Sequence, residues 1–136
     1  MTNGERADRL IREARQIAGE MRRSLADEAW NLATRRAQEA LELAIKALLS
    51  EMTVDYPKIH DPAPVFVHAV RARGIQVDVA LLDALATLSQ ELASIRGPAF
   101  YQETVVTEAQ ARDWVHRVER ALEFEEKLLR RLRRAG

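Results

Sequence analysis

The strongest helical signal in the chain is the run DEAWNLATRRAQEALELAIKALLSEM, residues 27–52. Its apolar residues recur every three to four positions, which is the period of an α-helix with one buried stripe. Its many alanines would allow a neighbouring helix to approach closely. The run predicts a helix over roughly residues 26–52, about 40 Å long at about 1.5 Å per residue. The apolar positions are Leu32, Ala33, Ala37, Ala40, Leu41, Ala44, Ile45, Leu48 and Leu49.

Two shorter patterns flank this run. The first predicts a helix that starts after Asn3, a residue type favoured as an N-cap. The second predicts a short helix over about residues 62–73, with Asp61 as its N-cap and Pro62 as its first helical residue. Gly74 would end it in a left-handed conformation. The buried stripe of the first helix would consist of Leu10, Ile11, Ala14, Ile17, Ala18 and Met21.

Two more helices follow in the second half of the chain. Asp78 is a suitable N-cap for a helix that we expect to stop at Gly97-Pro98. The capping box Thr107-x-x-Gln110 then opens a last helix that runs to about Arg134. The fourth helix would turn inward Leu81, Leu82, Leu85, Leu88, Leu92 and Ile95.

Four substantial helices and a short one, joined by short connections, predict an all-α fold. The expected architecture is an up-and-down four-helix bundle with an additional short helix. At 136 residues, with no internal repeat and no linker, we expect one domain over residues 1–136.

The composition excludes several classes of protein. With 47% hydrophobic and 31% charged residues, the chain is typical of a folded globular protein. Its 21 basic and 21 acidic side chains cancel, which argues against a strongly electrostatic nucleic-acid binder. The absence of cysteine excludes disulfides and thiolate chemistry. No apolar run reaches membrane-span length and no signal peptide precedes the first helix, so we expect a cytoplasmic protein without membrane contact.

Common catalytic and metal-binding motifs are missing. The five glycines are scattered, so no phosphate-cradling loop is present. Neither His-Glu-x-x-His nor Glu-x-x-His occurs, and we therefore expect no metal and no cofactor. We interpret the charges of residues 123–134 as a solvated face held by pairs such as Glu126 and Arg130. Trp30 and Trp114 are expected to be core or interface anchors.

The segment VDYPKIHDPAPVF, residues 54–66, differs from the helices around it and holds three of the four prolines. Its His60 lies directly before a predicted helix start, where anions are attracted. An imidazole titrates near neutrality and could move protons. Alternatively, His60 could bond a backbone carbonyl and stabilise the corner. Both interpretations remain open at this point.

Residues 36–66, RAQEALELAIKALLSEMTVDYPKIHDPAPVF, resemble the central portion of a HEPN domain. The likeness lies in an Ala- and Glu-bearing helix that ends in Lys-Ala-Leu-Leu, followed by a loop and the pair His60-Asp61. Downstream, Arg96, Ala99 and Tyr101 resemble the family's Arg-x-x-Ala-x-Tyr element. The matching helix residues are Gln38, Glu39, Ala40, Glu42, Lys46, Ala47, Leu48 and Leu49.

The resemblance implies a helical bundle that is usually dimeric and often encoded beside a small nucleotidyltransferase. The family includes metal-independent ribonuclease toxins and non-catalytic members linked to nucleotide or nucleic-acid binding. Its ribonucleases carry an Arg followed, after four to six residues, by a His. In this chain Arg112 and His116 have three residues between them, and Tyr101 stands where Arg96 would require the His.

We therefore expect a non-enzymatic homodimer that binds nucleotide or RNA, or that partners a nucleotidyltransferase, with no catalytic residues. One alternative is a toxin-like ribonuclease whose pair is assembled from distant residues, such as Arg35 or Arg96 with His60. The other is a purely structural interaction module. The candidate ligand-binding residues are Lys46, Lys58, His60, Asp61, Arg96 and Tyr101.

Overall fold

The computed structural model describes residues 1–56, 58–100 and 104–135, with residues 98–100 described as backbone. Within these residues the secondary structure is entirely helical, which confirms the predicted all-α fold. None of the helices has a stretch, over the described residues, that is long and apolar enough to cross a bilayer. The five helices are α1 (Asn3–Ala26), α2 (Trp30–Glu51), α3 (Ala63–Ala72), α4 (Val79–Phe100) and α5 (Glu108–Ala135).

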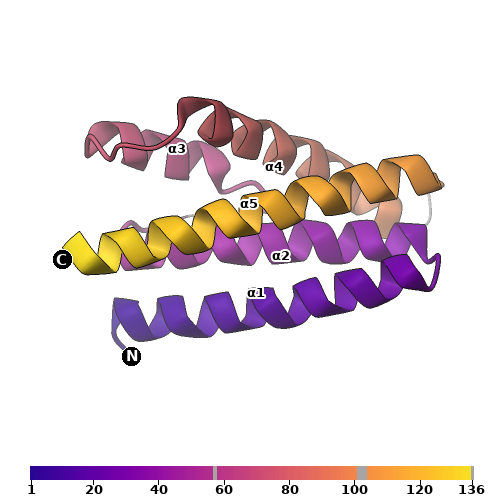
Figure 1. Cartoon of the computed structure of the whole chain (residues 1–136), viewed down its shortest axis with the longest axis horizontal. Coiled ribbons are helices and arrows are strands. Elements are labelled where there is room, and N and C mark those ends of the chain that lie inside the picture. The colour runs from indigo at the N-terminus through magenta and orange to yellow at the C-terminus, as the bar shows by residue number, and fades with distance from the viewer. Residues whose placement is uncertain (57, 101–103, 136) are drawn as a thin grey trace.

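Helix α2 lies at the centre of the bundle (Figure 1). It contacts each of the other four helices. Helix α1 runs antiparallel along one side of it, while α3 and α4 lie on the opposite side and α5 passes along its length. The two termini lie at the same end of the molecule. The arrangement is the expected four-helix bundle with one short additional helix.

Small side chains on α1 and α2 explain their extensive contact. The distance between two packed helices depends on the side chains at the contact, and alanines allow the closest approach. Burial of these alanines is nearly complete on both helices, so the alanine pattern of α2 predicted its packing correctly. They are Ala7, Ala14 and Ala18 on α1, and Ala33, Ala37, Ala40, Ala44 and Ala47 on α2.

Helix α1 begins one residue earlier than expected, and α2 begins four residues later. Thr2, not Asn3, is the N-cap of α1: its hydroxyl accepts from the Glu5 backbone at 3.0 Å, and the Glu5 carboxylate accepts from the Thr2 backbone in return. This reciprocal capping box satisfies two backbone donors, which Asn3 would not do. The predicted start of α2 at residue 26 was four residues early, because Glu28 adopts a left-handed φ of 60° and reverses the chain.

The boundaries of the later helices contain two further corrections. Asp61 does not cap α3, whose N-cap is Pro62 with no side-chain hydrogen bond. Helix α4 begins as expected, with the Asp78 carboxylate accepting from two backbone amides, but it continues through Gly97-Pro98 to Phe100. A proline in the final turn removes only one intrahelical hydrogen bond, and few turns remain for it to disrupt. Gly74 has the expected positive φ, 62°.

The predicted core positions are largely confirmed. The exception on α4 is Leu81, whose expected inward position is wrong, since 39% of it stays exposed. The two tryptophans are half-buried and pack around a small cluster built on Val106 and Ala111. Trp30 stacks under the Arg112 guanidinium at 5.3 Å, and the Trp114 indole donates to Glu91 at 3.2 Å.

Glu125 is the one position of α5 where the expectation of a solvated charged face fails outright. It falls on the apolar stripe of the helix, seven residues after Val118, and its side chain is fully buried. Among the residues that the structure describes, neither carboxylate oxygen has a hydrogen-bond partner. Burial, with a smaller contribution from the neighbouring Glu126 charge, raises the pKa of Glu125 well above its ordinary value of 4.5. The expected Glu126–Arg130 pair is also replaced, because Glu126 bonds Arg15 of α1 at 2.6 Å.

We expect Glu125→Leu to stabilise the protein. Leucine has a similar size and leaves no buried polar atom unsatisfied, so the free energy of unfolding should rise by about 1–3 kcal/mol at neutral pH. Urea unfolding monitored by circular dichroism measures the change. Glu125→Gln is the matched control, because it cannot ionise in the unfolded chain but keeps an unsatisfied polar group in the folded one, and it should give a smaller gain.

The gain should also depend on pH. Above about pH 4.5 the unfolded chain releases the Glu125 proton while the folded chain keeps it. The free energy of unfolding of the wild type is therefore not reduced by this group below about pH 4.5. Above that pH it falls as the pH rises, by up to about 1.36 kcal/mol per pH unit. The advantage of Glu125→Leu should be larger at neutral pH than near pH 4.5. An advantage that is equal at both would contradict a neutral buried carboxyl.

Candidate functional site

A row of polar side chains runs along α2 on the side that faces the loop of residues 53–62. Gln38, Glu42 and Lys46 are four residues apart, so they lie above one another on the same helix face. Gln38 is buried, and the side chains of Glu42 and Lys46 are only 13% and 14% exposed. Polar groups that are so well enclosed need partners within the protein.

Glu42 is the centre of this row. Its carboxylate accepts from the Lys46 ammonium at 2.6 Å, from the Gln38 amide at 2.8 Å, and lies 3.0 Å from His60 Nδ1. Burial by itself would raise the pKa of Glu42, but the hydrogen bonds from Lys46, Gln38 and His60 outweigh it. Together with the charge of Lys46, they lower the pKa below its ordinary value. Glu42 is therefore ionised at neutral pH.

The ionised Glu42 fixes the orientation of His60. A carboxylate can only accept hydrogen bonds, so the contact assigns a proton to His60 Nδ1. The ring is held from the helix side while 54% of its side chain remains exposed. The other nitrogen, Nε2, is consequently the one that a ligand would meet. Of the two interpretations of His60, the one in which Nδ1 bonds a backbone carbonyl does not hold, because its partner is this carboxylate.

Gln38 connects the row to α4. Its Oε1 accepts from Arg96 Nε at 2.9 Å, while its Nε2 donates to Glu42 and also to the His60 backbone oxygen at 3.3 Å. The structure thus brings three predicted site residues, Lys46, His60 and Arg96, onto one face of α2. They belong to separate segments of the chain, and two side chains that were not among the candidates, Gln38 and Glu42, join them.

Asp61 takes a different role from the one expected. Its Oδ1 accepts from the Ser89 hydroxyl of α4 at 2.6 Å, which links the start of α3 to α4. Ser89 itself is buried, and nothing in the sequence pattern distinguished it. Asp61 therefore stabilises the corner beside His60, and no side chain caps α3.

Lys58 lies on the wall of a separate cavity of about 250 Å³ between the start of α1 and the end of α2. Arg6 also lines it, and among the described residues neither of these cations has an acidic partner within ion-pair distance. Tyr56 joins the cavity to the polar row, because its ring lies 5.7 Å from the Lys46 ammonium. The remaining lining residues are Asn3, Ser50, Thr53, Val54 and Asp55.

The remaining candidate is Tyr101, and the remaining class of site is a metal centre. Tyr101 lies outside the described residues, so its expected role stays a prediction. No group of three His, Asp or Glu side chains suited to a metal ion occurs in the part of the chain that the structure describes. The spacing of Gln38, Glu42 and Lys46 was the signal that could have found the centre of the site, since polar residues four apart interrupted an otherwise apolar face.

We expect Glu42→Gln to destabilise the fold at neutral pH, by about 1–2 kcal/mol, because Lys46 and His60 lose a charged acceptor. A group with a lowered pKa contributes stability above its unfolded-state pKa and loses it as the pH falls through its folded-state value. The deficit of the variant should therefore shrink in acid. Urea unfolding over a pH series measures it.

Glu13→Gln is the control, since Glu13 forms an exposed pair with Arg9 at 3.9 Å and should change little. If the deficit of Glu42→Gln stays constant at every pH, the ionised carboxylate is not what stabilises this face.

Comparison with known proteins agrees with the sequence resemblance. The family model for the HEPN domain matches residues 7–128. No curated protein and no solved structure matches the chain. Because the matched region includes all of α2, α3 and α4 and nearly all of the rest, the chain belongs to the HEPN domain family.

Proposed function

We propose that this protein binds the phosphate groups of a nucleotide or of RNA without cleaving them. The observation that carries the proposal is the position of Lys58 and Arg6 on the wall of one cavity, where these two cations outnumber the single carboxylate, Asp55, and neither is ion-paired with a described residue. Phosphate oxygens are favoured partners of such side chains. With a net charge of zero, the protein would bind through this local group and not through a basic surface.

The neighbouring side chains suit the remainder of such a ligand. Tyr56 lines the same cavity and offers a ring on which a base could stack, and His60 presents Nε2 on the adjoining face. Lys46 is already neutralised by Glu42, so it would orient Tyr56 and leave the direct phosphate contact to Lys58 and Arg6. Membership of the HEPN family, which has nucleotide- and RNA-related roles, supports this class of ligand.

The proposal includes the oligomeric state and the partner that the family resemblance implies. We propose a homodimer, and a nucleotidyltransferase as the partner protein. The molar mass of the purified chain by light scattering tests the first, and co-purification with the product of a neighbouring nucleotidyltransferase gene tests the second.

Titration calorimetry with ATP and with a short single-stranded RNA tests the binding site. Lys58→Ala and Arg6→Ala should each weaken binding roughly tenfold, and added salt should weaken wild-type binding. Arg23→Ala is the matched control, because it removes an exposed cation in the last turn of α1, at the opposite end of that helix from Arg6. Absence of heat with both ligands, or equal losses in the control, would reject the proposal.

A second candidate function, metal-independent RNA cleavage, is favoured by one observation. Glu42 holds His60 as a carboxylate holds a catalytic imidazole, and the exposed Nε2 could accept a 2′-hydroxyl proton. Arg96 lies one side chain away, across Gln38, where its charge could stabilise a phosphorane only if Gln38 moved. This gap is why we place binding ahead of cleavage.

Incubation of end-labelled RNA with excess chelator separates the two functions. We expect intact RNA, because among the described residues the link from Arg96 to the His60 segment runs through the Gln38 side chain. Cleavage that is abolished by His60→Ala but retained in His116→Ala, which alters an exposed histidine of α5, would establish the ribonuclease instead.

A further inference from the structure

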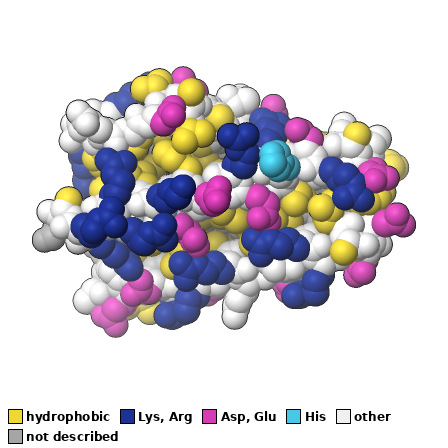
Figure 2. Space-filling model, in the orientation of Figure 1, with side chains coloured by type: hydrophobic (Ala, Val, Ile, Leu, Met, Phe, Trp, Pro, Cys, Tyr) yellow, Lys and Arg dark blue, Asp and Glu magenta, His cyan; other side chains and the backbone are white. Residues whose placement is uncertain are grey.

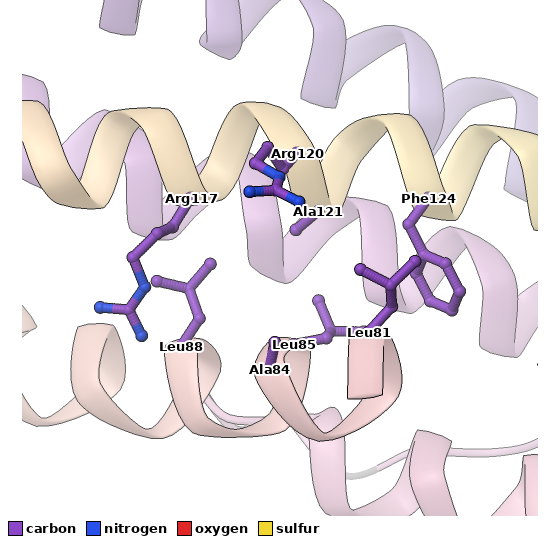
Figure 3. Close-up of a pocket in the computed structure, with 8 residues that line it drawn as sticks. All are labelled: Leu81, Ala84, Leu85, Leu88, Arg117, Arg120, Ala121 and Phe124. Atoms are coloured by element: carbon purple, nitrogen blue, oxygen red, sulfur yellow. The ribbon is translucent and has the colours of Figure 1, made fainter. Parts of the chain in front are cut away.

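A hydrophobic groove lies between α4 and α5. Figure 2 shows hydrophobic side chains at the surface along this strip, with basic side chains beside them. The groove contains a cavity of about 170 Å³ whose walls come from these two helices alone (Figure 3). Its lining consists of Leu81, Ala84, Leu85, Leu88, Arg117, Arg120, Ala121 and Phe124.

The lining residues follow the helical repeat on both walls. On α4 they are spaced from Leu81 to Leu88, and on α5 from Arg117 to Phe124, so each wall covers two turns at intervals of three or four residues. Two antiparallel helices that present such stripes to the same slot form the seat for a third helix. A volume near 170 Å³ accommodates one leucine- or phenylalanine-sized side chain at a time.

The apolar surface of the groove is not fully covered by the chain itself. Leu81, which lines the groove, is 39% exposed. Leu81 lies at the mouth of the slot beside Phe124 of α5, which covers it only in part (Figure 3). Exposed apolar side chains that adjoin a groove are typical of a surface that another protein covers.

The charges at the rim of the groove indicate which charge a partner should carry there. Arg117 is neutralised within the chain by Glu91 at 2.7 Å and Asp113 at 3.3 Å. Arg120, three residues further on the same wall, has no carboxylate within ion-pair distance among the described residues. One uncompensated positive charge therefore borders the hydrophobic slot.

We propose that the α4–α5 groove binds an amphipathic helix of a partner protein. One apolar side chain of that helix would enter the slot, those at the neighbouring turns (i, i+3 or i+4, i+7) would lie along the exposed apolar edge at Leu81, and an acidic side chain would pair with Arg120. The alternative occupant is a second copy of this chain, and the oligomeric state of the groove variants distinguishes it from a partner protein. The proposal is independent of phosphate binding, because none of its residues lines the cavity beside Lys58.

The test uses two synthetic helical peptides with leucines at i, i+3 and i+7, one flanked by glutamates and the other by lysines. We expect the acidic peptide to bind roughly tenfold more tightly in fluorescence anisotropy. Amide shifts in NMR spectra of the full chain should locate it at Leu81, Leu85 and Phe124. Equal binding of both peptides, or shifts elsewhere, would overturn the proposal.

Variants of the groove make the test specific. Ala84→Trp fills the slot from an exposed position and should abolish binding, and Arg120→Glu should reverse the preference between the peptides. Arg130→Glu, an exposed charge reversal beyond the groove on α5, should leave the preference unchanged. Circular dichroism confirms that each variant is folded, and calorimetry with ATP should be unaffected in all three. If Ala84→Trp or Arg120→Glu instead converts a dimer to a monomer, a second copy occupies the groove and the proposal is wrong.

Discussion

The enclosure of α2 is the constraint on which the rest of this structure depends. The helix contacts every other helix, so a polar side chain on it can rarely reach bulk water and has to find partners in the protein. Alanine fills most of its buried positions and allows close packing with α1. Where the helix carries Gln38, Glu42 and Lys46, the same enclosure forces them to bond one another, the loop and α4. The candidate site is thus a consequence of the way in which a central helix satisfies its polar groups.

Two glutamates illustrate opposite solutions to burial. Glu42 receives hydrogen bonds from Lys46 and Gln38 and contacts His60, so it stays ionised despite its low exposure. Glu125 is buried more completely and has no partner for either oxygen among the described residues. Burial therefore raises its pKa and favours the protonated carboxyl. The first arrangement orients an imidazole and ties three segments together. The second costs stability, and nothing in the described structure gives it a compensating contact.

The molecule presents two surfaces with different chemistry. The cavity beside Lys58 and Arg6 is polar, adjoins the Glu42 network and suits an anionic ligand. The groove between α4 and α5 is mainly apolar, with a single uncompensated charge at Arg120, and suits a helix. They are lined by different residues, so a ligand in one does not occupy the other.

The sequence by itself determined the helices, their buried stripes and the family, because helical periodicity and capping are local and survive in any packing. It also placed His60, Lys46 and Arg96 among the residues of interest. It did not show that Gln38 and Glu42 join them, that Asp61 bonds Ser89 and not its own helix, or that Glu125 is buried. Those outcomes depend on which helix faces meet, and long-range packing decides this. A carboxylate has the same local pattern whether a neighbouring helix brings it hydrogen-bond donors, as for Glu42, or only hydrocarbon, as for Glu125.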